Sequence, residues 1–133
     1  MTQLRISEAA ALLGISDDTL RRWLESEGIP TSKDPGKHTT VAGVDVARLA
    51  SRASAPEDQS GVARSARNHF TGIVTRVVAD GVMAQVELQC GPHRVVSLMS
   101  SEAAAELQLE VGAVATAVVK ATMVIVETPA LRA

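Results

Sequence analysis

The sequence predicts two small domains of different class, a helix-rich domain followed by an all-β barrel with one short helix. Before residue 54 the apolar residues recur every three or four positions, which is helical spacing. Beyond residue 64, runs of Val, Ile and Thr are typical of strands. Between them, Ser54–Gly61 collects Pro, Gly, Ser and acidic residues without hydrophobic periodicity. We therefore expect domains at residues 1–53 and 65–133, joined by a linker at 54–64.

The first domain carries the start and stop signals of two helices joined by a tight turn. Ser7 is expected to cap the first helix and Gly14 to end it, because glycine adopts the left-handed conformation without steric cost. Ser16 is expected to cap the second helix. A helix, a glycine-containing turn and a second capped helix form the helix-turn-helix signature. The inward-facing apolar positions are Ile6, Ala9, Ala10, Leu13, Leu20, Trp23 and Leu24.

The next segment predicts a β-hairpin, or wing, and a third helix. Ile29–Thr31 and Thr39–Val41 flank a turn at Lys33–His38, which contains Asp-Pro-Gly. The third helix is expected from about Val44 to Ala53, with Val46, Leu49 and Ala50 facing inward. The first domain is therefore predicted to be a winged helix-turn-helix.

Residues 3–53 resemble the MerR-like winged helix-turn-helix superfamily, in particular its short excisionase-like members. The resemblance depends on Ile6–Ser16 followed by Thr19–Trp23. It implies binding to a double-stranded DNA operator, since recognition helices present their first residues to the major groove. The residues expected to face DNA are Ser16, Asp17, Thr19, Arg21, Arg22, Lys33, Lys37 and His38, with Arg5 as a further cation.

Charge gives this DNA hypothesis no general support. The formal net charge is −2, and residues 1–54 carry seven Lys and Arg against seven Asp and Glu. A strongly basic domain would have indicated phosphate neutralisation by itself. The alternative is a solvated helix with balanced charge, on which Asp17 and Asp18 would repel phosphate. DNA binding must therefore depend on where the cations lie.

The second domain predicts five short strands and one helix, which suit a small OB-like barrel. Turns are expected at Asp80-Gly81 and Gly91-Pro92, and Ser101 is expected to cap the helix. The expected elements are strands at Phe70–Val78, Val82–Leu88, Arg94–Leu98, Val114–Lys120 and Met123–Glu127, and a helix at Glu102–Leu107.

Two segments of the second domain concentrate hydrogen-bond donors. Ser65–Gly72 supplies a hydroxyl, a guanidinium and a carboxamide just before a strand, and Lys120–Thr122 supplies an ammonium and a hydroxyl. Tetrahedral dianions such as sulfate, molybdate or tungstate are held by converging neutral donors with about one cation. The plain alternative is a polar start of a strand and a lysine at the rim of the barrel.

Residues 65–127 resemble the Mop domain, the molybdate- and tungstate-binding form of the TOBE fold. The matching motifs are the Ser-Ala-Arg-Asn-x-Phe-x-Gly opening, the Glu102–Leu107 helix, Val111-Gly112 and Val119–Thr122. The resemblance implies a homo-oligomer, a hexamer built as a trimer of dimers, with the oxyanion bound between subunits. Thr122 stands where serine is more usual and keeps the hydroxyl. The implied ligands are Ser65, Arg67, Asn68, Lys120, Ala121 and Thr122.

Several other functions are not supported. The sequence has no nucleophile–base pair and no phosphate-binding glycine loop, so an enzyme is not expected. Cys90 and His93 form no complete metal set, and we expect no metal and a thiol in a turn. The apolar run Val111–Val126 falls short of the ~20 residues of a spanning helix and no leader opens the chain, so a cytoplasmic protein without a membrane partner is expected. With one Trp, one Phe and no Tyr, each small domain needs added stabilisation, and self-association is expected to supply it.

The leading hypothesis is therefore a molybdate- or tungstate-binding, oligomeric, DNA-binding transcriptional regulator. Two alternatives remain open. One is an intracellular molybdate storage or buffer protein whose helix-turn-helix is not a molybdate-dependent regulator. The other is a DNA-binding protein whose barrel serves only for oligomerisation.

Overall fold

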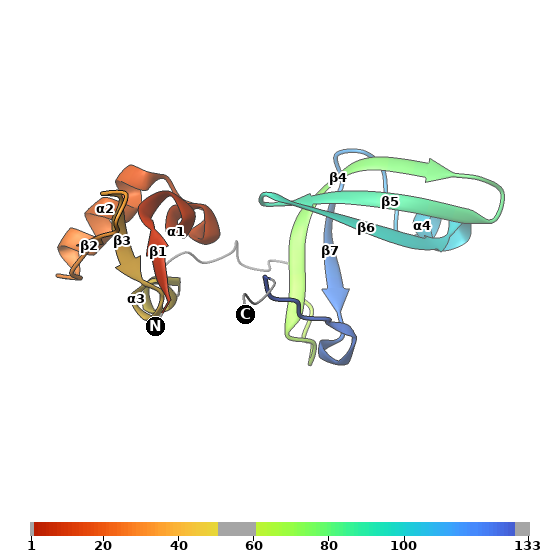
Figure 1. The fold of residues 1–133 in the computed structure, drawn as a ribbon. Coiled ribbons are helices and arrows are strands. Elements are labelled where there is room, and N and C mark those ends of the chain that lie inside the picture. Colours follow the sequence, from red (N-terminus) through yellow and green to blue (C-terminus); the bar gives the residue numbers. More distant parts are fainter. Residues whose placement is uncertain (1, 51–60, 130–133) are drawn as a thin grey trace. The chain divides into compact units, whose positions relative to one another are not determined.

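The structure is a computed structural model that describes residues 2–50 and 61–129. The chain forms two compact units, Met1–Ala55 and Pro56–Ala133. Figure 1 shows one unit rich in helices and one built mainly of strands. Of the expected linker, residues 54–60 lie outside the described residues, and residues 61–64 have no regular secondary structure.

The N-terminal unit places three helices around a small antiparallel sheet of order β1-β3-β2. Its elements are β1 (Gln3–Arg5), α1 (Ile6–Leu13), α2 (Asp17–Ser26), β2 (Ser32–Lys33), β3 (Thr39–Ala42) and α3 (Gly43–Leu49). The expected hairpin forms, but its first strand lies at Ser32–Lys33 instead of Ile29–Thr31. Strand β1 was missed, because three residues are too short for a periodic signal; it pairs Leu4 with Val41. Residues 51–53 of the expected third helix lie outside the described residues.

The ends of α1 and α2 follow local chemistry. Gly14 ends α1 with φ 71°, and Ser16 caps α2 by accepting a hydrogen bond from the Thr19 N–H at 3.1 Å, so both predictions are confirmed. The expected cap at Ser7 is wrong. Helix α1 begins at Ile6 with Arg5 as its N-cap, and the Arg5 N–H donates to Glu8 Oε1 at 3.3 Å. Glu8 thereby satisfies the amide at the cap position, and the helix begins directly after β1.

The core of the N-terminal unit lies between the helices and the sheet. Trp23 is half-buried against it, as expected, whereas Ala50 is exposed and does not face inward. Its buried members are Ile6, Ala9, Ala10, Leu20, Leu24, Val41, Val46 and Leu49. This core fixes α2 against the rest of the unit through Leu20 and Leu24.

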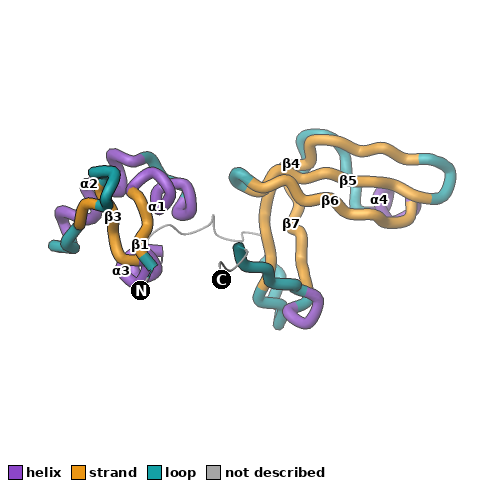
Figure 2. Tube along the Cα trace, viewed as in Figure 1, coloured by secondary structure: helices purple, strands orange, loops and turns teal. Residues whose placement is uncertain are grey.

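The C-terminal unit is one antiparallel sheet of order β6-β5-β4-β7 with a short helix. Its elements are β4 (Asn68–Ala79), β5 (Met83–Cys90), β6 (His93–Ser100), α4 (Ser101–Glu106), β7 (Val114–Val119) and the 3₁₀ turn η2 (Ala121–Met123). Residues 68–73 of β4 pair with β7 and residues 73–79 pair with β5, with a bulge between Val74 and Arg76. Figure 2 shows β4 bending along its length, so that the sheet curls.

The curled sheet is a half-barrel and is consistent with an OB-like fold. Among the described residues, β6 and β7 are the outer strands of the sheet, so the barrel expected from the sequence is not closed. The predicted strand at Met123–Glu127 is wrong: Ala121–Met123 form η2, and residues 124–129 have no regular structure. A strand needs a neighbouring strand, and residues 124–127 pair with none in the described part of the chain. Lys120 likewise follows the end of β7 instead of belonging to it.

Helix α4 begins one residue away from the predicted cap. Ser100, not Ser101, is the N-cap, and its hydroxyl accepts from the Ala103 N–H at 3.0 Å. Ser101 Oγ instead donates to the Asp80 carbonyl at 2.7 Å. The two serines therefore have separate roles, one capping the helix and one joining it to the turn before β5.

The core of the C-terminal unit is small. Its buried members are Val74, Val86, Leu88 and Cys90, with Val77, Val95, Met99, Leu109, Ala113 and Ala115 packed against them. Many large apolar side chains remain exposed, among them Phe70, Leu98, Leu107, Val111, Val114, Met123, Ile125 and Val126. Within the residues that the structure describes, no helix is long and apolar enough to cross a membrane.

Candidate functional site

The two donor segments of the C-terminal unit meet at one end of the β4–β7 pair. Asn68, the first residue of β4, pairs with Val119, the last residue of β7. Because the strands are antiparallel, Ser65 and Arg67 lie just before this end and Lys120–Thr122 lie just after it. The structure thus brings together segments that are far apart in the sequence.

The local chemistry at this end suits an anion. Asn68 is half-buried, and the side chains of Ser65, Arg67, Lys120 and Thr122 are exposed. Within the described residues these side chains make no hydrogen bond or ion pair, so their donors are uncommitted. The sequence contains no acid at residues 59–79 or 111–126, so nothing in either segment opposes the charges of the arginine and the lysine. Ala121 begins η2, and N–H groups at the start of a helical turn have no acceptor within it.

Gly72 has a packing role at the bend of β4. A Cβ atom at this position would lie 2.6 Å from Cys90 Sγ and would also clash with the Gln89 carbonyl. Glycine therefore allows β5 to pass close to β4 where β4 leaves β7. The sequence placed this glycine at the end of the donor segment Ser65–Gly72 and gave no sign of the contact between the strands.

Cys90 is not in a turn, contrary to expectation. It is the last residue of β5, is buried, and its Sγ donates to the Phe70 carbonyl at 3.5 Å. Burial raises the pKa of this thiol. Its strand partner His93 is exposed. In the described parts of the chain, no group of three or more His, Cys, Asp or Glu side chains could hold a metal ion.

A half-buried ion pair joins β5 and β6 and was also missed. Arg94 donates to both carboxylate oxygens of Glu87, at 3.2 Å from Nε to Oε2 and in a second, closer contact from Nη2 to Oε1. Gln85 Nε2 donates to Oε1 at 3.3 Å. The Arg94 hydrogen bonds, in the first place, hold the pKa of Glu87 below its ordinary value. Opposite charges on neighbouring predicted strands were the available signal.

On helix α2 the candidate DNA-facing residues divide between two flanks. Ser16 Oγ donates to Thr19 Oγ1 at 2.9 Å, and Arg22 Nη2 donates to the same atom at 3.2 Å, so these three residues form one row. Arg21 lies elsewhere, in a shallow groove that the helix shares with Ile29, Thr31 and Thr39. Asp17 is exposed in the first turn. The two neighbouring arginines therefore do not present their charges to the same side.

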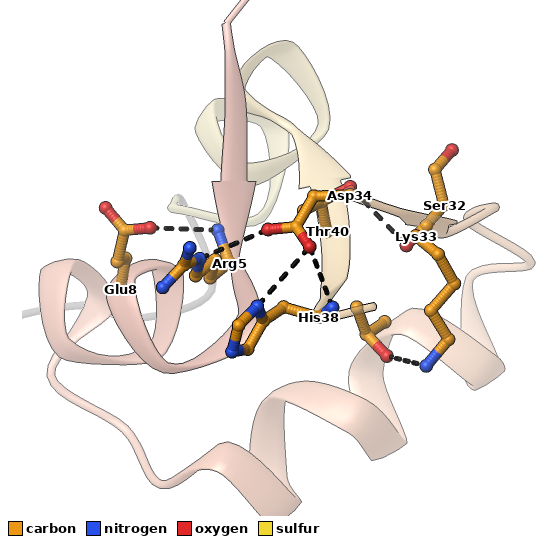
Figure 3. Close-up of polar contacts among 8 residues, drawn as sticks. Arg5, Glu8, Ser32, Lys33, Asp34, His38 and Thr40 are labelled. Atoms are coloured by element: carbon orange, nitrogen blue, oxygen red, sulfur yellow. Dashed lines mark hydrogen bonds and ion pairs between the residues drawn. The ribbon is translucent and has the colours of Figure 1, made fainter. Parts of the chain in front are cut away.

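The β2–β3 hairpin carries Lys33, Lys37 and His38, and its polar contacts centre on Asp34 (Figure 3). The Asp34 carboxylate accepts from the His38 N–H at 2.8 Å, contacts His38 Nδ1 at 3.3 Å, and accepts from Arg5 Nε at 3.3 Å. The hydrogen bond from the His38 backbone is the largest cause of the lowered pKa of Asp34, and the His38 side chain and the Arg5 charge add to it.

Most of the basic side chains on the hairpin or beside it have polar partners. Arg5 and His38 are engaged by Asp34, and Lys33 Nζ donates to Thr39 Oγ1 at 2.7 Å (Figure 3). Lys37 stands in the turn with φ 63° and an exposed side chain. Sequence reasoning missed Asp34, although an aspartate that opens an Asp-Pro-Gly turn is known to hydrogen-bond the backbone of that turn.

Comparisons with known proteins agree with this division of the chain. Residues 4–54 match the helix-turn-helix domain family, and residues 64–126 match the TOBE domain family. The fold and these matches define a protein that joins a helix-turn-helix domain to a TOBE domain. The C-terminal half of the chain belongs to the TOBE domain family. Among curated proteins, none matches the chain.

Three solved structures are similar to the C-terminal half. MopII from Clostridium pasteurianum is 36% identical, with 50% of this chain and 100% of that chain covered and a TM-score of 0.47. A molybdate-binding protein from Sporomusa ovata is 30% identical, with 50% of this chain and 100% of that chain covered and a TM-score of 0.48. The cytoplasmic molybdate-binding protein ModG, with molybdate bound, is 43% identical, with 48% of this chain and 46% of that chain covered and a TM-score of 0.44. Because the TM-scores lie below 0.5, the similarity to these three proteins depends on sequence identity and not on superposition of the structures.

Proposed function

We propose that this protein is a cytoplasmic, oligomeric DNA-binding regulator that binds molybdate or tungstate through its C-terminal unit. The observation that carries the proposal is the meeting of the β4 and β7 donor segments in a TOBE domain that shares its chain with a helix-turn-helix domain. The proposed boundaries are residues 1–53 for the DNA-binding domain, 54–64 for the linker and 65–133 for the oxyanion-binding domain.

The proposed ion site combines two charges with neutral donors. Arg67 and Lys120 offset the charge of the dianion, Ser65 and Thr122 donate through hydroxyls, and Asn68 donates through its amide. Ala121 contributes its backbone N–H. A tetrahedral dianion accepts hydrogen bonds on every oxygen, so this mixture of donors suits it better than a cluster of cations alone.

The C-terminal unit of one chain leaves part of this site open to solvent, and a second copy would complete it. The half-barrel has two outer strands, and large apolar residues such as Leu98 and Val114 are 69% and 78% exposed. Exposed apolar surface of this kind marks interaction surfaces, and a small core gains stability by association. We propose a hexamer, a trimer of dimers, with the oxyanion bound between subunits.

The proposed DNA-binding surface is that of a MerR-like winged helix-turn-helix. In this proposal Ser16, Asp17 and Thr19 at the start of α2 approach base edges, and Arg21 and Arg22 approach phosphates on its two flanks. Lys33, Lys37 and His38 lie on the β2–β3 hairpin, which acts as the wing. The match to a helix-turn-helix domain supports DNA binding, and the hairpin after α2 supports the winged type.

The ion site is tested by native mass spectrometry and calorimetric titration with molybdate. The wild type is expected to bind molybdate as an oligomer. Lys120→Met is expected to weaken binding at least about tenfold, because a hydrogen bond to a charged group contributes about 1.5–3 kcal/mol. The matched control Lys37→Met lies in the other unit and should bind as the wild type does. Wild-type protein that binds no molybdate would overturn the proposal.

A storage or buffer protein is the second candidate. It is favoured by one observation: the C-terminal half alone covers the whole length of MopII and of the Sporomusa ovata protein. Those two chains therefore contain no counterpart of the helix-turn-helix domain. Selection of genomic fragments by the full chain separates the two functions. A regulator retains a defined DNA sequence, whereas a storage protein retains none and still binds several ions per oligomer.

A further inference from the structure

Asp34 closes the turn of the β2–β3 hairpin with both its backbone and its side chain. The Asp34 N–H donates to the His38 carbonyl at 2.9 Å, and the Asp34 carbonyl accepts from the Lys37 N–H at 2.8 Å. Its carboxylate also accepts from the His38 N–H at 2.8 Å. These bonds hold Lys37 at φ 63°, in the left-handed region that is unfavourable for a residue with a Cβ.

The second carboxylate oxygen of Asp34 joins this turn to the start of the helix-turn-helix. It accepts from Arg5 Nε at 3.3 Å. Arg5 is the last residue of β1 and the N-cap of α1, it pairs with Thr40 of β3, and its N–H donates to Glu8. Figure 3 shows the carboxylate between the Arg5 and His38 side chains. One acid therefore connects the turn, the sheet and α1.

An acid at this place is unexpected on a surface that approaches phosphates. The Asp34 side chain is 20% exposed and offsets the charge of Arg5. By charge alone, its removal should strengthen binding to DNA. Its contacts serve the hairpin instead, because they hold the backbone of Lys37, the one hairpin lysine that makes no side-chain hydrogen bond among the described residues.

We propose that Asp34 is a positioning residue for DNA binding, which fixes the hairpin turn against α1 so that Lys37 contacts a phosphate. This inference rests on the proposed DNA-binding function. Asp34 itself touches no DNA and acts through Lys37.

The test exploits the opposite signs of the two effects. The full-length chain is titrated onto labelled mixed-sequence double-stranded DNA, with fluorescence anisotropy read at several salt concentrations. Asp34→Ala is expected to weaken binding about threefold or more and to lower the salt slope by about 1, because one phosphate contact is lost. The matched control Asp18→Ala removes an exposed acid of α2 that holds no turn, and it is expected to strengthen binding.

Two further variants test whether the weaker binding of Asp34→Ala comes from the loss of the Asp34 contacts. Asp34→Asn keeps an oxygen that can accept from the His38 N–H but loses the Arg5 ion pair, and it is expected to fall between the wild type and Asp34→Ala. Lys37→Ala is expected to weaken binding by the wild type and to have no further effect on the residual binding of Asp34→Ala, whose circular dichroism spectrum must match that of the wild type.

The outcomes separate this inference from the function on which it rests. Binding by Asp34→Ala or Asp34→Asn that equals or exceeds that of the wild type, or an unchanged salt slope, overturns the positioning role alone. A wild type that binds no DNA overturns the DNA-binding function together with it.

Discussion

Gly72 is the residue on which the close approach of β4 and β5 depends. A methyl group there would meet the backbone of Gln89, which cannot rotate away, and the buried Cys90 thiol. We expect Gly72→Ala to lower the free energy of unfolding of the C-terminal unit by about 1–3 kcal/mol, because overpacking forces the backbone to shift. Chemical denaturation of the full chain measures this change.

Gly81 provides the matched control for that substitution. A Cβ atom at Gly81 would meet no atom within 4 Å. Gly81→Ala is therefore expected to change the unfolding free energy by less than about 0.5 kcal/mol. Equal losses in the two variants would show that the contact of Gly72 with β5 is not the cause.

Individual residues were predictable where their chemistry is local. Gly14 and Ser16 act at helix ends through atoms within a few positions, so the sequence alone indicates their roles. The role of Gly72 depends on Gln89 and Cys90 across the sheet, which local spacing does not reveal. The donors at Ser65–Asn68 and Lys120–Thr122 could be named from the sequence, but their meeting depends on the β4–β7 register.

At the scale of elements, each cap assignment has a measurable consequence. Ser100→Ala is expected to destabilise the C-terminal unit by about 1 kcal/mol, because α4 loses the acceptor for the Ala103 N–H. Thermal unfolding followed by circular dichroism measures the loss. A Ser100→Ala variant as stable as the wild type would contradict the observed cap position and would favour the one predicted at Ser101.

The Glu87–Arg94 pair links β5 to β6 in a way that depends on pH. Because Arg94 lowers the pKa of Glu87 from its ordinary value in the folded state, the pair contributes its whole stabilisation at pH values above the ordinary carboxyl pKa. This contribution is lost as the pH falls through the lowered pKa. We expect the melting temperature of the wild type to exceed that of Glu87→Gln at neutral pH, and the difference to shrink on acidification.

The control for the pH experiment is Glu106→Gln on the exposed surface of α4, which should leave the pH profile of the wild type unchanged. A Glu87→Gln difference that stays constant from neutral to acidic pH would show that the effect comes from packing and not from charge.

Strands were predictable where a partner lies next to them in sequence. The hairpins β2–β3, β4–β5 and β5–β6 follow from alternation and turn residues. Strand β1 is too short to show a period, and Met123–Glu127 has the residues of a strand but no pairing partner among the described residues. Alternation of polar and apolar residues indicates a tendency to form a strand. It does not show whether the edge of another strand is available for pairing.

At the scale of the whole molecule, the main feature is that the sheet of the C-terminal unit does not close into a barrel within the described residues. An open half-barrel with exposed apolar side chains predicts association. We expect native mass spectrometry to show an oligomer, with six subunits as the proposed number, and a monomer at micromolar concentration would contradict this. Composition predicted the need for association, but the number of subunits comes from family resemblance alone.

The central claim is that oxyanion binding in one unit affects DNA binding by the other. By linkage, an ion that favours one assembly geometry changes DNA affinity, and DNA changes ion affinity by the same factor. The decisive measurement is the affinity of the full chain for its selected DNA sequence with and without saturating molybdate, in the wild type and in Lys120→Met. We predict that molybdate changes the DNA affinity of the wild type at least about fivefold and leaves that of Lys120→Met unchanged. Equal wild-type affinities at zero and saturating molybdate would contradict the account.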